Sequence, residues 1–302
     1  MGDGKTRYDD YLAEELKNFE ELAKFLRPSP GGIPRLDGID IGGLFMPLYG
    51  VIGGDLVTYI DFSSRYDLPR RVERARSAGL TAVAEKLSLL HERAGILVAD
   101  ISGHRITDAL IAAMLHQAFL LGAYYELDMF GEITTRLFEQ LNQRFYRTTT
   151  INKYLTMIYG EISRQGTFRF LSAAHQPPAV FSREYGQFVT ISPDRLVTLP
   201  PVAMFPSRAD PDASNHPNLI GYKERYEVNE INLLAKGDIL LLSTDGFAEH
   251  ADGSFFPEKV RQLLAASDGS SASQICDRLR QAIIAAGEQT DDLSVVVIKK
   301  TG

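Results

Sequence analysis

Four aspartate motifs border apolar runs that have the residue composition of β-strands. Two of them stand directly before such a run, and two stand at the end of one. The motifs, each with its run, are Gly53-Gly54-Asp55 before 56–60, Asp100 after 95–99, Thr244-Asp245-Gly246 after 239–243, and Asp291-Asp292 before 293–298. An aspartate at a strand end is commonly part of a turn. Four motifs of one design on one chain nevertheless favour a shared site.

Strands that run in opposite directions would place all four motifs at the same rim of the sheets. Carboxylates gathered there would repel one another strongly unless cations neutralised them. Hard oxygen ligands, without cysteines or a histidine pair, suit Mg²⁺ or Mn²⁺ with water completing the coordination. Gly54, Gly103 and Gly246 stand beside the aspartates and would let backbone carbonyls and water approach closely. The residues therefore predict a divalent-metal site.

The elements that must position these aspartates are a mixture of strands and helices. Strands are expected at 56–60, 95–99, 155–162, 167–172, 179–182, 239–243 and 293–298. Helices are expected at 69–91, 107–125, 130–146, 257–266 and 271–286. Because the strands come in groups rather than alternating strictly with helices, the pattern favours an α+β fold with antiparallel sheets.

The N-terminal segment has a pattern of its own. Apolar residues recur at helical spacing over 8–26, and a Pro- and Gly-rich stretch follows at 27–32. This predicts a linker or regulatory helix over residues 1–30, followed by one large domain over residues 31–302. Whether the helix packs on its own domain or serves signalling and dimerisation is left open by the pattern.

Composition narrows the class of protein. The 302 residues carry a net charge of −7, which argues against a surface built for nucleic acid. Cys276 is the single cysteine, so no intramolecular disulfide can form and a reducing compartment, the cytoplasm, is expected. No membrane span is expected, because the most apolar helix is interrupted by His116 and Gln117.

In chain order the motifs resemble those of the PPM (type-2C-like) serine/threonine phosphatases, and specifically the SpoIIE-like, RsbU-type bacterial branch. The segments that carry the resemblance are Gly53-Gly54-Asp55, Asp100-Ile101-Ser102-Gly103-His104, Ala173-Ala174-His175-Gln176-Pro177-Pro178, Leu199-Pro200-Pro201-Val202, Thr244-Asp245-Gly246-Phe247-Ala248-Glu249 and Asp291-Asp292-Leu293-Ser294. The resemblance implies a four-layer α-β-β-α sandwich of two antiparallel sheets flanked by helices. It also implies a centre of two divalent metals, Mn²⁺ or Mg²⁺, at one edge of the sheets.

The resemblance assigns roles to individual residues. Asp100 would bridge the two metals, and the carbonyl of Ile101 would complete the coordination of one of them. Asp245 and Asp291 would hold the first metal, while Asp55 would serve the second directly or through water. Residues expected to support these ligands, or to contact the phosphate, are Asp292, Gly54, Gly103, His104, Arg105 and Gly246. Asp292 would also serve as an alternative ligand.

The activity that the resemblance implies is hydrolysis of phosphoserine or phosphothreonine by water activated between two metals, without a covalent intermediate. By analogy with the branch, the substrate would be a phosphorylated regulatory protein, an anti-sigma-factor antagonist of the STAS type. A homodimer through the N-terminal helix is a further expectation. The alternative is a PPM-fold binding module with weak or no catalysis.

Three features depart from the family pattern. A helical insertion at about 62–94 replaces a short hairpin, and either packs over the sheet or forms a docking element or lid. Arg105 replaces a glycine, and would contact a phosphate or pair with Asp108. The usual aspartate soon after Gly-Gly-Asp is absent and Asp61 stands further along, which leaves the ligation of the second metal open.

The sequence lacks the motifs of two other enzyme classes. A cyclic-dinucleotide synthase would need Glu and Phe where Leu56 and Val57 stand. A haloacid-dehalogenase-like phosphatase would need an Asp-x-Asp pair after its first strand, and the sequence offers none there.

Overall fold

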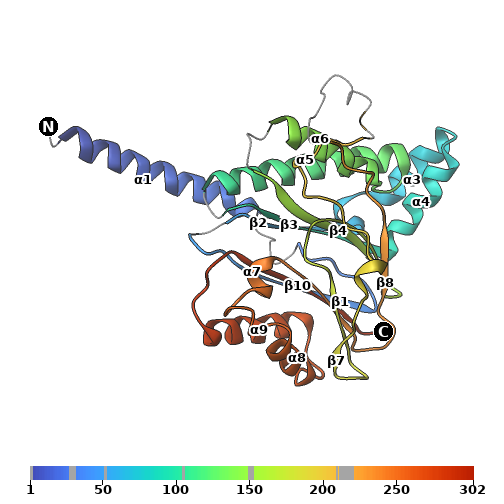
Figure 1. Cartoon of the computed structure of the whole chain (residues 1–302). Coiled ribbons are helices and arrows are strands. Elements are labelled where there is room, and N and C mark those ends of the chain that lie inside the picture. The colour runs from blue at the N-terminus through green and yellow to red at the C-terminus, as the bar shows by residue number, and fades with distance from the viewer. Residues whose placement is uncertain are drawn as a thin grey trace.

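Two antiparallel β-sheets lie face to face at the centre of the computed structural model (Figure 1). The structure describes residues 3–26, 32–50, 53–103, 106–148, 153–208, 210 and 221–302. In spatial order, sheet A consists of β1 (Ile39–Met46), β10 (Leu293–Lys300), β9 (Ile239–Ser243), β6 (Ala179–Ser182) and β7 (Gln187–Phe188). Sheet B consists of β2 (Asp55–Asp61), β3 (Arg93–Ile101), β4 (Leu155–Ser163), β5 (Thr167–Ala173) and β8 (Asn229–Asn232).

Each sheet carries its own layer of helices. The long helices α5 (Ile106–Phe130) and α6 (Thr135–Thr148) cover the outer face of sheet B, as Figure 1 shows. The helices α8 (Glu258–Ala265) and α9 (Ala272–Ala286) cover the outer face of sheet A. A 3₁₀ turn, η3 (Pro193–Arg195), lies in the connection between β7 and β8. The predicted α+β fold, a four-layer α-β-β-α sandwich, is therefore confirmed.

The central strands are buried on both faces. In β3, Ile96 and Val98 pack between the sheets, while Leu97 and Ala99 pack against the helices over sheet B. A strand that is covered on both sides has no polar face, so its sequence is a continuous apolar run. For this reason seven of the strands could be predicted from composition.

Strand β1 was not predicted, because two adjacent glycines weaken its sequence pattern. The structure explains both of them by close packing. A Cβ atom at Gly42 would lie 2.7 Å from the carbonyl carbon of Ala272 at the start of α9. A Cβ atom at Gly43 would lie 2.5 Å from the hydroxyl of Tyr59 in sheet B. The glycines thus let a helix and the second sheet approach the strand.

The insertion at 62–94 forms three helices, α2 (Phe62–Arg65), α3 (Leu68–Ser77) and α4 (Thr81–Leu89), and a 3₁₀ turn, η2 (Leu90–Glu92). Its buried side chains join the core over sheet B. Ion pairs of 2.6 Å join Arg71 to Asp128 in α5, and Lys86 to Glu132 beyond α5. The insertion therefore packs beside the helical layer, at the end of sheet B where β2 ends and β3 begins.

Helix α1 (Asp3–Ala23), with the 3₁₀ turn η1 (Lys24–Leu26), extends away from the two sheets (Figure 1). It begins five residues earlier than the sequence pattern predicted. Ala23 and Leu26 are buried, but Leu16, Leu22 and Phe25 are exposed. Most of the predicted Pro- and Gly-rich stretch that follows, residues 27–31, lies outside the described residues.

Helix α5 is more apolar than the sequence analysis allowed. By length and composition alone, residues Thr107–Phe130 would suffice to cross a membrane, although a third of the side chains in this window are buried in the protein. The buried face includes Leu115 and Phe119, which belong to the core over sheet B. Core helices of soluble proteins meet the same test of length and composition, so α5 is weak evidence for a membrane span.

Candidate metal centre

Asp55 and Asp100 face each other on adjacent strands. Asp55 begins β2 and Asp100 lies near the end of β3, and the antiparallel register pairs the two residues directly. Thr156 of β4 is the partner of Asp100 on its other side. Side chains opposite each other in an antiparallel pair project from the same face, with Cβ atoms about 4.5–5.5 Å apart. Sheet B therefore presents two carboxylates side by side at one rim.

Sheet A brings its carboxylates to the same edge. Asp245 is the first residue of the short helix α7 (Asp245–Ala248), directly after β9, and Asp291 and Asp292 stand directly before β10. Strands β9 and β10 are antiparallel, so the end of one lies beside the start of the other. Their connection is closed by Thr244, whose backbone N–H donates to the carbonyl of Ser294 at 3.1 Å.

Two side chains, those of Thr244 and Asp292, join the sheets at this edge. The Thr244 hydroxyl donates to Oδ2 of Asp55 at 2.7 Å, and it accepts from the Ser294 N–H at 3.0 Å. The buried carboxylate of Asp292 accepts from the N–H of Gly54 at 2.6 Å and from that of Leu48 at 2.7 Å. Asp292 thus holds the turn before Asp55 in place, and Thr244 orients the carboxylate of Asp55 itself.

The glycines at the site allow close approach of the backbone. A Cβ atom at Gly54 would lie 2.8 Å from the carbonyl oxygen of Ile101 and would clash with that of Gly103. One at Gly246 would clash with the carbonyl of Asp292. The carbonyl of Ile101 is therefore directed at the turn beside Asp55, where the resemblance places a metal ligand.

Lys153 holds the loop that follows Ile101, the last residue of β3. Its Nζ donates to the carbonyl of Ser102 at 2.8 Å and forms an ion pair of 2.5 Å with Asp108, whose side chain is fully buried in α5. Gly103 adopts a φ of +123°, which favours glycine. The predicted residues His104 and Arg105 lie outside the described part of the chain.

The electrostatics of the site disfavour several ionised carboxylates side by side. Burial, together with the negative charges of the neighbouring aspartates, raises the pKa of Asp100 to about 9. Burial also raises the pKa of Asp55 to about 8, although the Thr244 hydroxyl favours the ionised form. Asp245 shifts in the same direction, first through burial and then through Asp291. A cation would remove the repulsion that these shifts express.

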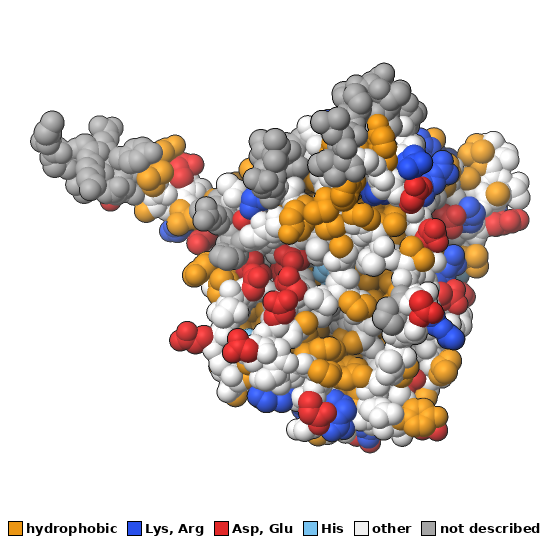
Figure 2. Space-filling model, in the orientation of Figure 1, with side chains coloured by type: hydrophobic (Ala, Val, Ile, Leu, Met, Phe, Trp, Pro, Cys, Tyr) orange, Lys and Arg blue, Asp and Glu red, His pale blue; other side chains and the backbone are white. Residues whose placement is uncertain are grey.

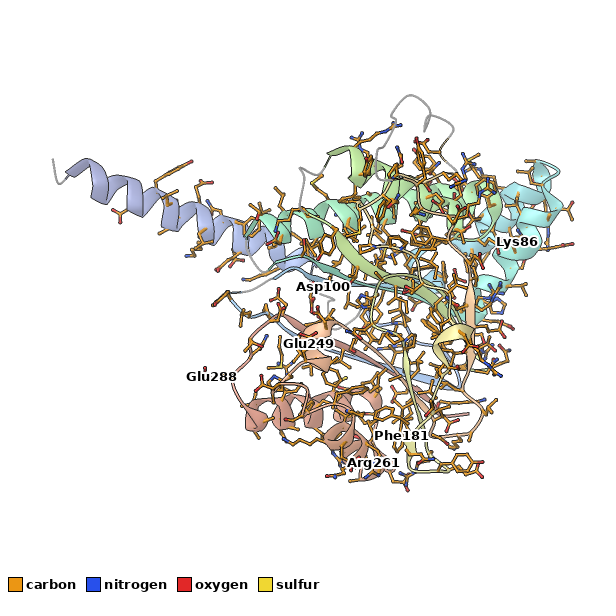
Figure 3. All side chains as sticks on the ribbon, in the orientation of Figure 1. Lys86, Asp100, Phe181, Glu249, Arg261 and Glu288 are labelled. Atoms are coloured by element: carbon orange, nitrogen blue, oxygen red, sulfur yellow. The ribbon has the colours of Figure 1, made fainter. Side chains whose placement is uncertain are left out.

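Acidic side chains gather at the edge where the two sheets meet, as Figure 2 shows. In Figure 3, Asp100 of sheet B lies above Glu249, which follows α7, at this same edge. Among the described residues, no three side chains of His, Cys, Asp or Glu converge closely enough to hold a metal by themselves. The donors are nevertheless all hard oxygens, so they fit a Mg²⁺ or Mn²⁺ ion that takes backbone carbonyls and water as its remaining ligands.

Asp61 is not part of this site. It lies at the opposite end of β2 from Asp55, where its carboxylate accepts from the N–H groups of Ser63 and Ser64 and caps α2. Asp61 therefore adds no carboxylate to the rim at Asp55.

His175 contacts the row of side chains that contains Asp100. Its Nδ1 lies 2.9 Å from the hydroxyl of Thr156, the strand partner of Asp100. Burial lowers the pKa of His175 to about 4, so the ring is neutral at physiological pH. The sequence named His175 and Thr244 only as members of motifs and gave them no role at the metal centre, and it did not identify Thr156 or Lys153.

Two comparisons of sequence bear on the family of this chain. The model of the family described as Stage II sporulation protein E (SpoIIE) matches residues 91–301. A comparison with curated protein sequences finds no match.

Three solved structures illustrate the likeness of fold. The RsbU and RsbW domains of Rv1364c from Mycobacterium tuberculosis align with a TM-score of 0.60 and 17% identity, covering 90% of this chain and 64% of that one. The phosphatase domain and regulatory fragment of SpoIIE from Bacillus subtilis align with a TM-score of 0.59 and 15% identity, covering 88% of this chain and 64% of that one. The SiaA-PP2C domain of Pseudomonas aeruginosa aligns with a TM-score of 0.62 and 14% identity, covering 97% of this chain and 98% of that one.

The chain thus spans under two thirds of the length of the first two of these structures. The family match covers more than half of the chain and includes three of the four aspartate motifs. The chain belongs to the SpoIIE family of PPM-type protein serine/threonine phosphatases, which are hydrolases.

Proposed function

We propose that this chain hydrolyses phosphoserine or phosphothreonine on a regulatory protein with the help of two divalent metals, Mn²⁺ or Mg²⁺. The observation that carries the proposal is the direct pairing of Asp55 with Asp100 at the rim where Asp245 and Asp291 also lie. These four side chains and the carbonyl of Ile101 are the proposed ligands. Asp100 would serve both metals, because it is paired with Asp55 and its pKa is also raised by the charges of Asp245 and Asp291.

Bound divalent cations would neutralise the phosphoryl oxygens and lower the pKa of an attacking water. The surrounding residues of the chain hold the ligands in position. Thr244 orients Asp55, Asp292 supports the turn at Gly54, and Lys153 holds the loop after Ile101. Fixed ligands reduce the reorganisation that accompanies charge development during phosphoryl transfer.

The substrate is proposed to be a phosphorylated protein of the STAS type, by analogy with the branch. We also propose a cytoplasmic location, because the single cysteine, Cys276, is buried and cannot form an intramolecular disulfide. A homodimer through α1 is supported by the exposed apolar residues Leu12, Leu16 and Leu22, which recur along a helix that extends from the domain.

The test is phosphate release from a serine-phosphorylated STAS-type protein in the presence of Mn²⁺. We expect turnover by the unaltered chain, and a loss in Asp100→Asn beyond the ~10–100-fold that outer-shell changes cost at metal sites. Asp268→Asn is the matched control, because this carboxylate is 79% exposed and pairs with Arg183 rather than with the metal centre. Metal binding without turnover on any phosphoprotein would instead support the binding-module alternative.

A further inference from the structure

A pocket of about 750 Å³ opens on the side of α6 that faces away from sheet B. Leu137, Leu141 and Phe145 on one side of α6 pack in the core, whereas the pocket residues recur at helical spacing on the other side. The residues that line the pocket are Thr135, Arg136, Glu139, Gln140, Gln143, Arg144, Arg147, Asp210, Arg225 and Tyr226. None of the aspartates of the metal centre is among them.

The pocket is basic in a protein whose net charge is −7. Four arginines line it, against two carboxylates, and each carboxylate has its own cation. Glu139 lies 2.7 Å from the buried Nζ of Lys223, and Asp210 lies 3.1 Å from Arg147. Within the described ranges, neither Arg136 nor Arg225 forms an ion pair with a carboxylate. The pocket therefore holds an excess of positive charge.

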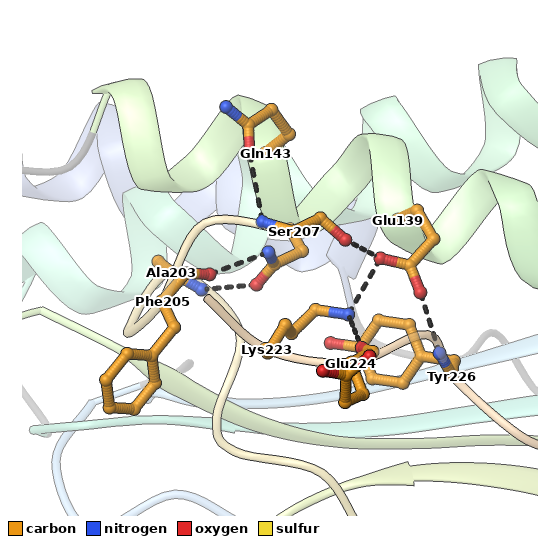
Figure 4. A network of polar contacts seen from close by, with 9 residues as sticks. Glu139, Gln143, Ala203, Phe205, Ser207, Lys223, Glu224 and Tyr226 are labelled. Carbon is orange, nitrogen blue, oxygen red and sulfur yellow. Dashed lines mark hydrogen bonds and ion pairs between the residues drawn. The ribbon is translucent and has the colours of Figure 1, made fainter. Parts of the chain in front are cut away.

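A hydrogen-bonded network gives the pocket a fixed floor (Figure 4). The carboxylate of Glu139 accepts from the Ser207 hydroxyl and from the backbone N–H of Tyr226, the latter at 2.7 Å, in addition to its ion pair. Asn142, three residues further along α6, donates to the carbonyl of Phe205 at 2.9 Å. The segment that contains Phe205 and Ser207 is thus held against α6, which fixes the floor of the pocket beneath its exposed arginines.

Two lining residues have a polar atom without a partner. Gln143 accepts from the Ser207 N–H at 3.3 Å through Oε1, but its Nε2 has no hydrogen-bond partner. The hydroxyl of Tyr226 likewise has none, and the two residues are 7% and 4% exposed. A buried polar group without a partner is destabilising. Both atoms can donate hydrogen bonds, as the arginines do, so donors exceed acceptors among the lining residues.

We propose that this pocket binds a small molecule that carries phosphate groups. Guanidinium groups bind phosphate oxygens in bidentate fashion, and an acceptor-rich anion supplies what the lining residues lack. The volume lies within the range of about 300–1,000 Å³ that is typical of small-molecule sites. Such a site is separate from the proposed phosphatase reaction, and its ligand would be held by side chains rather than by metal ions.

The test is calorimetric titration of the full chain with inorganic phosphate, pyrophosphate and a nucleoside triphosphate, first with Mg²⁺ and then in excess chelator. We expect saturable one-to-one binding of at least one probe that persists in chelator, because the pocket uses no metal. The three probes distinguish a simple phosphate site from a nucleotide site. In the variant Arg136→Gln/Arg225→Gln the affinity should fall by about tenfold or more, since the anion loses charged hydrogen bonds to both guanidinium groups.

Arg195→Gln/Arg280→Gln is the matched control, because it removes the same charge from exposed arginines that do not line the pocket. This control should bind the probe like the unaltered chain. Both double variants should keep their melting temperature and their phosphatase activity. Absence of binding by all three probes, an equal loss in both variants, or binding only of an acidic peptide would overturn the proposal.

Discussion

The hydroxyl of Thr244, directly after a strand of sheet A, lies 2.7 Å from Oδ2 of Asp55, the first residue of a strand of sheet B. Thr244 is fully buried between β9 and α7, whereas Asp55 begins β2. The same hydroxyl accepts from the N–H of Ser294, so its hydrogen is directed at the carboxylate. One side chain thus sets the orientation of a proposed metal ligand and also joins the two halves of the sandwich at the active edge.

Thr244→Val tests this relationship, because it keeps the shape of the side chain but removes the hydroxyl. We expect the affinity for Mn²⁺ to fall by roughly 10–100-fold, since residues that orient metal ligands have effects of that size. The free energy of unfolding should also fall by about 1–3 kcal/mol, because the Ser294 N–H loses its acceptor. Thr244→Ser retains the hydroxyl and should bind Mn²⁺ like the unaltered chain. Titration calorimetry and denaturant unfolding measure the two effects, and an unchanged Mn²⁺ affinity in Thr244→Val would contradict the role.

The raised pKa values predict how the metal-free protein responds to pH. Asp55 and Asp100 have pKa values of about 8 and 9 in the folded chain, compared with 3.8 for an unperturbed aspartate. Between pH 4 and pH 8 the folded chain therefore holds protons that the unfolded chain has released. The free energy of unfolding loses this contribution progressively as pH rises towards 9.

Asp100→Asn isolates that effect in excess chelator. We expect the variant to be more stable than the unaltered chain, by a difference that is small near pH 4 and grows up to pH 9. Thermal unfolding at a series of pH values measures the difference. With saturating Mn²⁺ the order should reverse, because only the unaltered chain gains the full stabilisation from bound metal. If the stability advantage of Asp100→Asn in chelator instead became smaller as pH rises, the electrostatic account would be contradicted.

The close packing at the turn before Asp55 predicts a strong effect of Gly54→Ala. The added Cβ atom would lie 2.8 Å from the carbonyl oxygen of Ile101 and would clash with that of Gly103. We expect a loss of about 1–3 kcal/mol in stability, as for other overpacked sites, together with weaker Mn²⁺ binding. Gly79→Ala is the control, because Gly79 has a φ of +74° but open space around it, far from the metal centre. It should lose stability without losing metal affinity.

The ion pair beneath the loop after β3 predicts that Lys153→Met destabilises the protein. Asp108 is fully buried, and removal of one partner of a buried pair costs about 3–5 kcal/mol. The carbonyl of Ser102 also loses a donor, so the carbonyl of Ile101 should be held less firmly. Adding Asp108→Asn to Lys153→Met should recover part of the stability but not the metal affinity. Denaturant unfolding of the single and double variants checks the first point, and additive losses would show that the two side chains do not interact.

The sequence predicted the parts of the fold that depend on local pattern. Apolar runs identified seven of the ten described strands, all but β1, β7 and β8. Opposite strand directions were enough to infer that the four aspartate motifs share one rim. The insertion was predicted as one helical run, but the structure divides it in two places. Asp67 caps the start of α3, and Gly79, with a positive φ, follows the end of α3. Both are local signals that the apolar periodicity of the segment concealed.

The remaining features depend on contacts between distant parts of the chain. Strand β8 is short and polar and is identified only by its pairing with β5. Thr244 and Asp55 are 189 residues apart, so their hydrogen bond has no sequence signal. The basic pocket likewise exists only where α6 meets the segment around Tyr226. Residue types can predict the chemistry of a site, but the partners that hold it are determined by the fold.

The most direct test of the central claim is a crystal structure of the full chain with Mn²⁺, with the ions located by anomalous scattering. The account predicts two peaks between Asp55, Asp100, Asp245 and Asp291, with Asp100 contacting both ions and the carbonyl of Ile101 contacting one. Anomalous peaks elsewhere, or none at this edge at saturating Mn²⁺, would contradict the proposed metal centre.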